Sequence, residues 1–414
     1  MTDETLALDG QLGGVPAREL AETYGTPLFL VDLDVLDLEI ARLLEAFEPH
    51  RIGVAYAAKA FFCTALAERL AETPLRLDVC SLGELVTAER GGFPAGRIYF
   101  HGCGKTADEL QAVVDRRVAF DVIDNREELE RLASLASGVP VPVPVMLRLN
   151  TGIEAHTHAF IRTGGENTKF GFALGEVPAA LARLAELPQL RLIGLHSHIG
   201  SQIADLAPFL ANLDELLAAA DRARQLGFPI EELICGGGIG VEEGPDDPRP
   251  VDLDALGAAL GGRAAERGYA LAVEPGRAVI ARAGSSLYRV MAVKTQGRRR
   301  FVVVDGGMTD NPRPALYGAR HLPEVLAAAA LGPDEPATLV GRSCENDEMG
   351  DYVLPRDLAA GDLLALRITG AYTYSMASNY NRFGRPPVVF VRDGNHRRVV
   401  RGERADDVLR LDLF

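Results

Sequence analysis

The sequence is poor in cysteine and in long apolar runs, and it carries no surplus of basic residues. Its five cysteines form an odd set without CxxC spacing, which argues against a disulfide framework and favours reduced thiols in a cytoplasmic protein. No apolar run reaches the ~18 residues that a membrane span needs, and the segment MTDETLALDG lacks the features of a signal peptide. The net charge of -15 argues against nucleic acid or an anionic membrane as the main partner, since phosphate binding needs clustered Lys and Arg.

The 414 residues suffice for two domains with sizeable cores. From about residue 50 to 277, apolar β-branched runs alternate with amphipathic helical stretches, which is typical of a parallel sheet built from βα units. The runs are IGVAYA (52–57), LRLDVC (75–80), RIYFH (97–101), VAFDVI (118–123), PVMLRLN (144–150), LRLIGLHSH (190–198), ELICGG (232–237) and YALAVEP (269–275). Eight such units predict a (β/α)8 barrel of the TIM type.

After residue 277 the pattern changes to strands with few helices between them. The segment SLYRVMAVKTQGRRRFVVVDGG predicts two strands around a polar turn, and DLLALRITG and PPVVFVRDG predict further strands. TPLFLVD (26–32) fits either domain. We therefore expect a barrel over residues 33–277 and a mostly β domain made of 1–32 and 278–414.

Active sites of such barrels lie at the carboxyl ends of the strands, so polar residues there are candidates for chemistry. These residues are Lys59, Asp78, His101, Arg148, His198, Gly236, Gly237, Gly238, Glu274 and Arg277. Lys59 lies within the apolar run VAYAAKAFF, where a desolvated amine has a lowered pKa and can attack an aldehyde cofactor. The alternative is a solvated charge at the barrel mouth.

The glycine turn after the seventh run, Gly236 to Gly238, fits a phosphate site, because glycines let backbone N–H groups approach an anion closely. The alternative is that these glycines only form a tight turn between a strand and a helix. A phosphate site, an amine and a partner for a ring nitrogen are what pyridoxal 5'-phosphate (PLP) requires. Glu274 can be that partner, and a carboxylate there keeps the nitrogen protonated, which favours decarboxylation. The alternative for Glu274 is a structural salt bridge with Arg277.

A series of motifs runs in order from about residue 54 to 381. They are AYAAKA, DVCSLGEL, HGCGKT, AHTHAFIRTGGENTKFGF, HSHIGSQI, CGGGIG, EPGR, PRPALYGARH, GRSCENDEMGDY and SMASNYN. Together they resemble the fold type III PLP-dependent decarboxylases, most closely the diaminopimelate decarboxylase branch. The resemblance implies an alanine racemase-type barrel with a mostly β C-terminal domain, PLP as cofactor and a small amino-acid substrate. It also implies a homodimer in which the second domain completes the active site.

The resemblance further implies roles for single residues. Lys59 would hold PLP, His198 would stack on its ring, and Glu274 would bind the ring nitrogen. The phosphate would be held by Ser201, Gly236, Gly237, Gly238, Gly276 and Arg277. The substrate's distal end would be recognised by Arg277, Arg313, Tyr317 and Glu345, and Tyr380 would touch cofactor or substrate. Cys344, reaching into the partner subunit's site with Glu345, would return a proton to the carbon that loses CO2; its alternative is a small buried hydrophobe.

Some segments depart from the family's pattern. GRSCENDEMGDY places Asp347 three and Glu348 four residues after Cys344, where the family has CESGD. PRPALYGARH carries Arg320 where the family commonly has an aromatic residue. SNYNRFGRPP interrupts the compact RPRP segment with which the family's motif ends. The resemblance implies meso-diaminopimelate as substrate. Because these departures fall on the substrate side, the alternative is another amino acid or a carrier-bound aminoacyl group, with the reaction type unchanged.

Two other classes of protein fit parts of the sequence. His196 and His198 lie on one face of a strand, as zinc ligands of barrel hydrolases do, but no further cluster at the other strand ends completes a metal site. A non-catalytic PLP carrier would not need the CENDE loop.

His156 and His158 are interpreted as loop residues. Lys169 is interpreted as a structural charge, and Asp78 with Arg148 as a possible ion pair at the rim.

Overall fold

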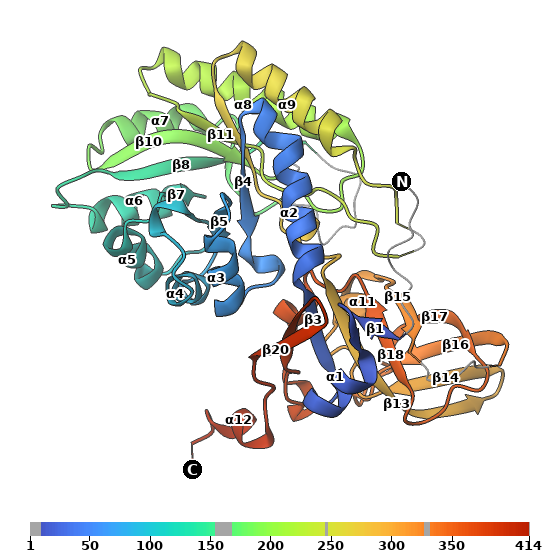
Figure 1. Cartoon of the computed structure of the whole chain (residues 1–414). Coiled ribbons are helices and arrows are strands. Elements are labelled where there is room, and N and C mark those ends of the chain that lie inside the picture. The colour runs from blue at the N-terminus through green and yellow to red at the C-terminus, as the bar shows by residue number, and fades with distance from the viewer. Residues whose placement is uncertain (1–9, 154–167, 245–246, 327–331, 414) are drawn as a thin grey trace. The chain divides into compact units, whose positions relative to one another are not determined.

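The computed structural model describes residues 10–153, 168–244, 247–326 and 332–413, so His156 and His158 lie outside the described residues. The chain divides into two compact units (Figure 1). The barrel unit comprises Ala41–Val241 and Pro248–Ala278, and the β unit comprises Met1–Ile40, Glu242–Asp247 and Val279–Phe414. Among the helices of the described ranges, none is both long and apolar enough to cross a membrane.

The barrel unit is a closed parallel sheet, and each predicted run contributes a strand to it. The strands are β4 (Ile52–Ala57), β5 (Arg76–Val79), β6 (Ile98–Phe100), β7 (Phe120–Ile123), β8 (Val143–Asn150), β10 (Leu190–Ser197), β11 (Glu232–Ile234) and β12 (Ala270–Val273). They pair in chain order, β12 pairs with β4, and β8 pairs with β10, which closes the barrel. The two-residue strand β9 (Phe172–Ala173) extends β8 and was not predicted from the sequence.

Helices follow the barrel strands, and some of them start at a residue whose side chain caps the first turn. They are α3 (Thr64–Ala71), α4 (Leu82–Arg90), α5 (Ala107–Arg116), α6 (Arg126–Leu135), α7 (Val177–Ala185), α8 (Leu206–Gln225) and α9 (Leu253–Glu266), and α2 (Leu33–Phe47) precedes β4. Thr106 and Glu109 form a capping box at α5, and the side chain of Asn125 accepts from Glu128 N at α6. Such caps satisfy backbone N–H groups that a helix leaves unpaired, so they favour a helix start at these two positions.

The barrel interior is apolar and filled by side chains rather than hollow. One cluster takes residues from seven of the strands: Ala55, Tyr99, Phe120, Val122, Met146, Ile193, Ile234 and Ala272. The rings of Tyr99 and Phe120 stack with centroids 4.0 Å apart. A packed interior leaves the strand ends as the place for polar chemistry.

The β unit is built on a mixed sheet with the order β17-β16-β14-β13-β3-β19-β20. Its strands are β3 (Leu28–Asp32), β13 (Gly284–Gln296), β14 (Arg299–Val304), β15 (Leu322–Val325), β16 (Asp334–Val340), β17 (Glu348–Pro355), β18 (Leu363–Arg367), β19 (Val388–Arg392) and β20 (Asn395–Val400). The predicted strand pair around a polar turn is the antiparallel pair β13–β14. TPLFLVD forms β3, which lies between β13 and β19 and therefore belongs to this sheet.

Short elements complete the β unit. They are β1 (Gln11–Leu12), β2 (Val15–Pro16), α1 (Ala17–Tyr24), α11 (Arg313–Tyr317) and α12 (Ala405–Leu409).

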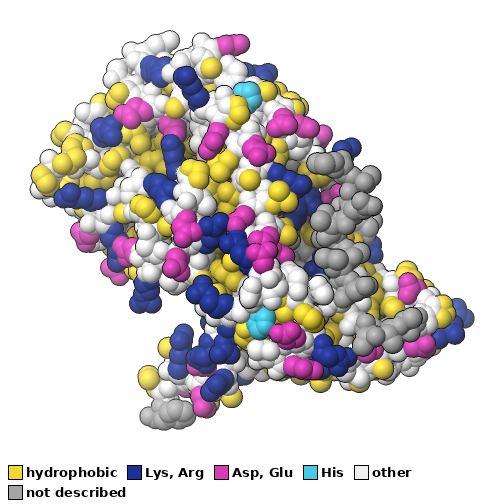
Figure 2. Space-filling model, viewed as in Figure 1, with side chains coloured by type: hydrophobic (Ala, Val, Ile, Leu, Met, Phe, Trp, Pro, Cys, Tyr) yellow, Lys and Arg dark blue, Asp and Glu magenta, His cyan; other side chains and the backbone are white. Residues whose placement is uncertain are grey.

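On the face shown in Figure 2, acidic and basic side chains are interspersed. The visible negative and positive charges therefore mix over this face instead of separating into large areas of one sign.

Candidate active site

A buried carboxylate lies between two imidazoles at the carboxyl ends of the barrel strands. Glu274 directly follows β12, His196 lies near the end of β10, and His101 directly follows β6. Oε2 of Glu274 is 3.0 Å from His196 Nε2, and Oε1 is 3.0 Å from His101 Nε2. All three side chains are buried. The alternative of a salt bridge with Arg277 is therefore not needed to explain how this carboxylate is held.

The two imidazoles fix the charge of Glu274. Burial acts to raise the pKa of Glu274, but the interactions with His101 and His196 outweigh it and hold the pKa well below its usual range. Burial lowers the pKa of His196 to about 4, so this ring is neutral at neutral pH and donates its Nε2–H to the carboxylate. Glu274 is thus an anion inside a dry part of the barrel.

The environment of Glu274 fits a protonated pyridine nitrogen. Although Oε1 lies close to His101 Nε2, the two groups are not aligned as a hydrogen bond, and within the described ranges Oε1 has no other donor. A buried carboxylate oxygen without an aligned donor is costly, and an N–H directed at it removes that cost. The N–H of a PLP ring meets this requirement.

The predicted phosphate segments lie side by side. Gly238 O accepts from Ile203 N at 2.9 Å, so the loop that contains Ser201 runs along the glycine turn. A Cβ at Gly237 would lie 2.1 Å from the carbonyl oxygen of Glu274, and one at Gly238 would lie 2.4 Å from that of Gly200. Only glycine fits these approaches, so the turn presents bare backbone. Gly276 and Arg277 follow Glu274 and are buried.

His198 is held by this turn. Gly237 N donates to His198 Nδ1 at 3.2 Å, which places the ring proton on Nε2. Burial, followed by the positive charge of Lys59, lowers the pKa of His198 well below its usual range. The ring is therefore a neutral, oriented aromatic surface near the Lys59 amine.

Lys59 lies in the short helical turn Ala58–Ala60 that follows β4, between two buried alanines. Its side chain is 45% exposed, so the expectation of a desolvated amine is wrong: Nζ reaches the mouth of the barrel. Asp78, which is buried, lies 3.7 Å from Nζ and also 3.7 Å from His101 Nε2. Arg148, suggested as the partner of Asp78, instead lies 3.8 Å from Asp124.

The other lysines are poor candidates for the cofactor amine. The sequence contains four lysines, and Lys169 and Lys294 are exposed. Lys105 is fully buried, but its Nζ lies 2.9 Å from Asp121 and 2.6 Å from Glu128 and donates to Val122 O. Two carboxylates and a carbonyl hold that ammonium in its charged form, so it is a structural group.

In the β unit, the predicted residues of the CENDE and SNYN segments meet. Tyr380 Oη donates to Glu345 Oε1 at 2.7 Å, and Cys344 N donates to Asn381 Oδ1 at 2.9 Å. Cys344 is exposed, which differs from the alternative of a small buried hydrophobe. These contacts present a thiol and a carboxylate together on one surface.

Arg313 and Tyr317 lie on the single turn of α11. The Arg313 guanidinium carbon is 5.5 Å from the centroid of the Tyr317 ring, and Nη2 donates to Glu243 Oε2 at 2.9 Å. Arg320, one of the departures from the family's pattern, donates to Asp351 O at 2.7 Å. Glu243 was not singled out from the sequence.

The departure at Asp347 has a structural role. This residue is buried with φ +47°, and its carboxylate accepts from Met308 N at 2.7 Å and from Ser343 N at 3.1 Å. Its own carbonyl accepts from Gly341 N. The carboxylate therefore folds back under the segment that presents Cys344. Glu348, by contrast, is exposed and pairs with Arg299.

Asp347→Asn is expected to lower the free energy of unfolding by about 1–3 kcal/mol, because an amide NH2 would face one of two buried N–H donors. Chemical denaturation measures this change. The matched control is Asp351→Asn, whose side chain is 80% exposed and which we expect to shift stability by less than ~0.5 kcal/mol. Equal stability of the two variants would show that Asp347 does not hold this segment.

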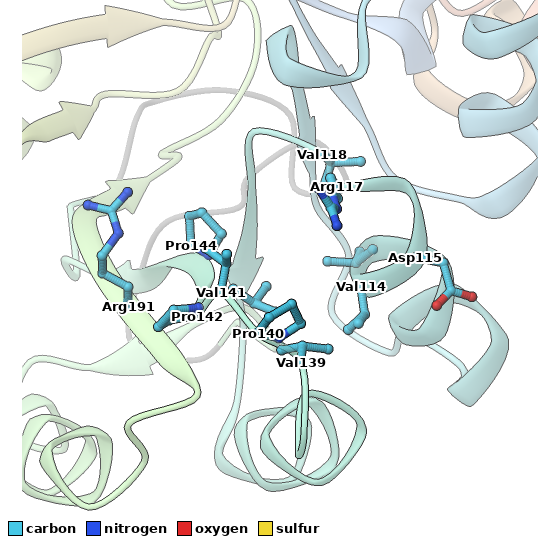
Figure 3. A pocket seen from close by; sticks show the side chains of 12 residues that line it. Val114, Asp115, Arg117, Val118, Val139, Pro140, Val141, Pro142, Pro144 and Arg191 are labelled. Carbon is cyan, nitrogen blue, oxygen red and sulfur yellow. The ribbon is translucent and has the colours of Figure 1, made fainter.

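A cavity of about 500 Å³ lies elsewhere in the barrel unit (Figure 3). Its lining includes Val118, Val143 and Arg191, which stand at the amino ends of β7, β8 and β10. The labelled prolines and valines of residues 139–144 stand between Arg191 and the labelled residues of 114–118. This is the end of the barrel opposite the glycine turn and Glu274, where barrel enzymes carry stability rather than catalysis.

Three groups of the type that hold metal ions meet at these strand ends, a cluster that the sequence did not indicate. One ligand atom each from His101, His196 and Glu274 lie within 4.8 Å of one another. The sequence pointed to His196 with His198, but the third strand supplies His101 instead. The cluster has the composition of a metal site, and its carboxylate also has the negative charge that a protonated ring nitrogen requires.

Residues 35–281 match the family described as pyridoxal-dependent decarboxylase, pyridoxal binding domain. The chain belongs to this family of PLP-dependent carboxy-lyases. Over 97% of its length it is 43% identical to the diaminopimelate decarboxylase of Actinosynnema pretiosum subsp. auranticum, covering 92% of that protein. It is 40% identical to that of Bacillus subtilis, again over 97% of this chain and 95% of the relative. The structure of Helicobacter pylori diaminopimelate decarboxylase complexed with L-lysine is similar, with a TM-score of 0.90 and 30% identity over 95% of this chain and 98% of that one.

Proposed function

We propose that this chain converts meso-diaminopimelate to L-lysine and CO2. The observation that carries the proposal is the identity of 40–43% with diaminopimelate decarboxylases over 97% of the chain. The buried anion Glu274 supports it, because a carboxylate at the ring nitrogen suits decarboxylation. The binding of L-lysine by the Helicobacter pylori relative is in line with lysine as the product.

The barrel unit is proposed to hold the cofactor. Lys59 would supply the amine for the cofactor's aldehyde carbon, Glu274 the acceptor for the ring N–H, and His198 the face on which the ring stacks. Ser201, the turn Gly236–Gly238, and Gly276 with Arg277 would bind the phosphate, helped by the bare backbone of the turn. Tyr380 would touch cofactor or substrate.

When bound, PLP supplies an electron sink for the electron pair that remains when the bond to the departing carboxylate breaks. Glu274 keeps positive charge on the ring nitrogen and so strengthens that sink. Arg277, Arg313, Tyr317 and Glu345 would orient the substrate by its distal end. Cys344 would then deliver a proton to the carbon from which CO2 has left, which completes the replacement of carboxylate by hydrogen.

The active site is proposed to be shared in a homodimer. The barrel domain would span 33–277, and the β-rich domain of 1–32 and 278–414 would complete the site across the dimer. Cys344 and Glu345 are exposed on the β unit and held by contacts with residues 380 and 381. Such exposure suits residues that act on a neighbouring subunit, as the family resemblance implies.

A substrate panel tests the proposed activity. Purified enzyme with PLP is expected to release CO2 from meso-diaminopimelate and to form equimolar L-lysine. Lysine, ornithine, arginine and glutamate derivatives should give much lower kcat/KM. Suppose instead that kcat/KM is higher for one of these compounds, or for a carrier-bound aminoacyl group, than for meso-diaminopimelate. The departures at Arg320 and at residues 347–348 would then mark a different substrate.

A further inference from the structure

Lys105 is a buried ammonium to which the proposed function gives no part in the reaction. Its side chain is 1% exposed and reaches from the loop after β6 to the next strand and helix of the barrel. Nζ donates to Glu128 Oε1 at 2.6 Å and to Val122 O at 2.7 Å, and it lies 2.9 Å from Asp121 Oδ1. Burial acts to lower the pKa of Lys105, but the two acids outweigh burial and raise it, so the ammonium stays charged. Nζ is therefore fixed by β7 and by α6 together.

The side chain of Lys105 anchors the loop between β6 and α5. This loop begins at His101, whose N–H donates to Val79 O at 2.7 Å, and it ends at the cap Thr106. Lys105 runs back along the loop, since a Cβ on Gly102 would lie 3.3 Å from Lys105 Cγ and 3.8 Å from its Cε. Gly102 has φ +133°, which glycine adopts far more readily than other residues. The side chain of Lys105 therefore constrains the path of the backbone that leaves His101.

Helix α6 holds the backbone of the same loop. Arg131 Nη1 donates to Lys105 O at 3.0 Å, and Asn125 Nδ2 donates to Cys103 O at 3.4 Å. These bonds secure the second half of the loop, whereas the buried ammonium ties it into the wall of the barrel. The loop thus joins β7 and α6 at several points, and Lys105 supplies the charged one.

His101, at the start of this loop, contacts the central acid of the candidate active site. Its Nε2 lies 3.0 Å from Glu274 Oε1 and 3.7 Å from Asp78 Oδ1. Burial acts to raise the pKa of Glu274, and the interaction with His101 is the largest of those that lower it. We propose that Lys105 is a positioning residue, which fixes this loop and so holds the ring of His101 against Glu274. This inference rests on the proposed function, since it assigns Glu274 to the ring nitrogen of the cofactor.

A double-variant cycle tests whether Lys105 acts through His101. Lys105→Met keeps a long side chain but removes the ammonium, and we expect kcat for meso-diaminopimelate to fall about tenfold, because a displaced His101 no longer supports Glu274. The Kd of the apoenzyme for PLP, followed by absorbance, should rise several-fold. His101→Gln is expected to give losses of similar size. In the variant with both changes the losses should not multiply: once His101 is replaced, Lys105→Met should change kcat and Kd by less than about twofold.

Arg183→Met is the matched control for Lys105→Met. Arg183 also pairs with two acids, Glu130 and Glu186, at 2.7 Å each, but it lies on the surface of α7. This variant should leave kcat and the Kd for PLP unchanged. Losses that multiply in the double variant would mean that Lys105 supports the fold without acting through His101, and they would overturn the inference. Wild-type values of kcat and Kd in Lys105→Met would overturn it as well.

A second variant covers the case in which Lys105→Met does not fold because two buried acids lose their cation. Lys105→Met combined with Glu128→Gln removes one of the two acids and replaces the single variant in the same cycle, with the same expected pattern. A wild-type enzyme that binds PLP but releases no CO2 from meso-diaminopimelate would instead disprove the proposed function. The Kd values for PLP would still test the inference, so the two failures differ.

Discussion

Replacement of Lys59 by alanine is expected to abolish CO2 release and the yellow absorbance of bound cofactor that borohydride bleaches. The reason is chemical: without the Nζ amine, the chain cannot form the proposed covalent bond to the cofactor's aldehyde carbon. Lys105 cannot substitute, since two buried carboxylates keep its ammonium charged and in place. Absorbance spectra before and after borohydride, together with a CO2 assay, measure the effect.

The matched control is Lys294→Ala, an exposed lysine on β13 of the β unit. This variant should keep both colour and activity, because its amine has no proposed contact with the cofactor. Substantial turnover by Lys59→Ala would place the cofactor amine elsewhere and would remove the basis of the proposed mechanism.

Glu274→Gln is expected to lower kcat by roughly 10²–10³, the usual cost of removing one preorganised electrostatic group from an active site. Glutamine keeps the size of the side chain but cannot hold positive charge on the ring nitrogen. The pKa of Glu274 lies well below its usual range, so the native carboxylate stays ionised throughout the neutral pH range. The loss should therefore be the same across the neutral range, which a pH profile of kcat would show.

Cofactor binding should largely survive in Glu274→Gln, because the backbone of the glycine turn is untouched. Titration of the apoenzyme with PLP, followed by absorbance, separates lost binding from lost chemistry. Glu266→Gln, at the exposed end of α9, serves as the control. Activity within tenfold of wild type would show that the carboxylate does not tune the ring.

The barrel was predictable from the sequence because its signals are local. Each buried parallel strand appears as a short apolar run, and the helices appear as a three-and-four periodicity. Some of these helices begin at a cap such as Thr106 or Asn125. The strand-end rule then singled out Lys59, His198 and Glu274 without any knowledge of contacts. β9 was not predicted because a strand of two residues is too short to show a periodicity of apolar residues.

The partners of these residues were not predictable, because they come from distant parts of the chain. His101 had been placed at a strand end, but nothing in the sequence aims its ring at Glu274 rather than at Asp78. The ion pair of Glu243 with Arg313 joins positions 70 apart. Asp347 was noticed only as a departure from a motif. Its hydrogen bonds depend on a left-handed backbone conformation, which aspartate adopts only uncommonly, so the residue type does not predict it.

The position of β3 has a consequence for biosynthesis. This strand ends at Asp32, yet its two neighbours are β13, which begins at Gly284, and β19, which begins at Val388. On the ribosome, β3 is made before the barrel strands, and it has neither of these hydrogen-bonding neighbours until β13 and then β19 have emerged. The barrel strands, all encoded in between, can assemble first. During synthesis, the unpaired edges of β3 are thus open to aggregation and to chaperone capture.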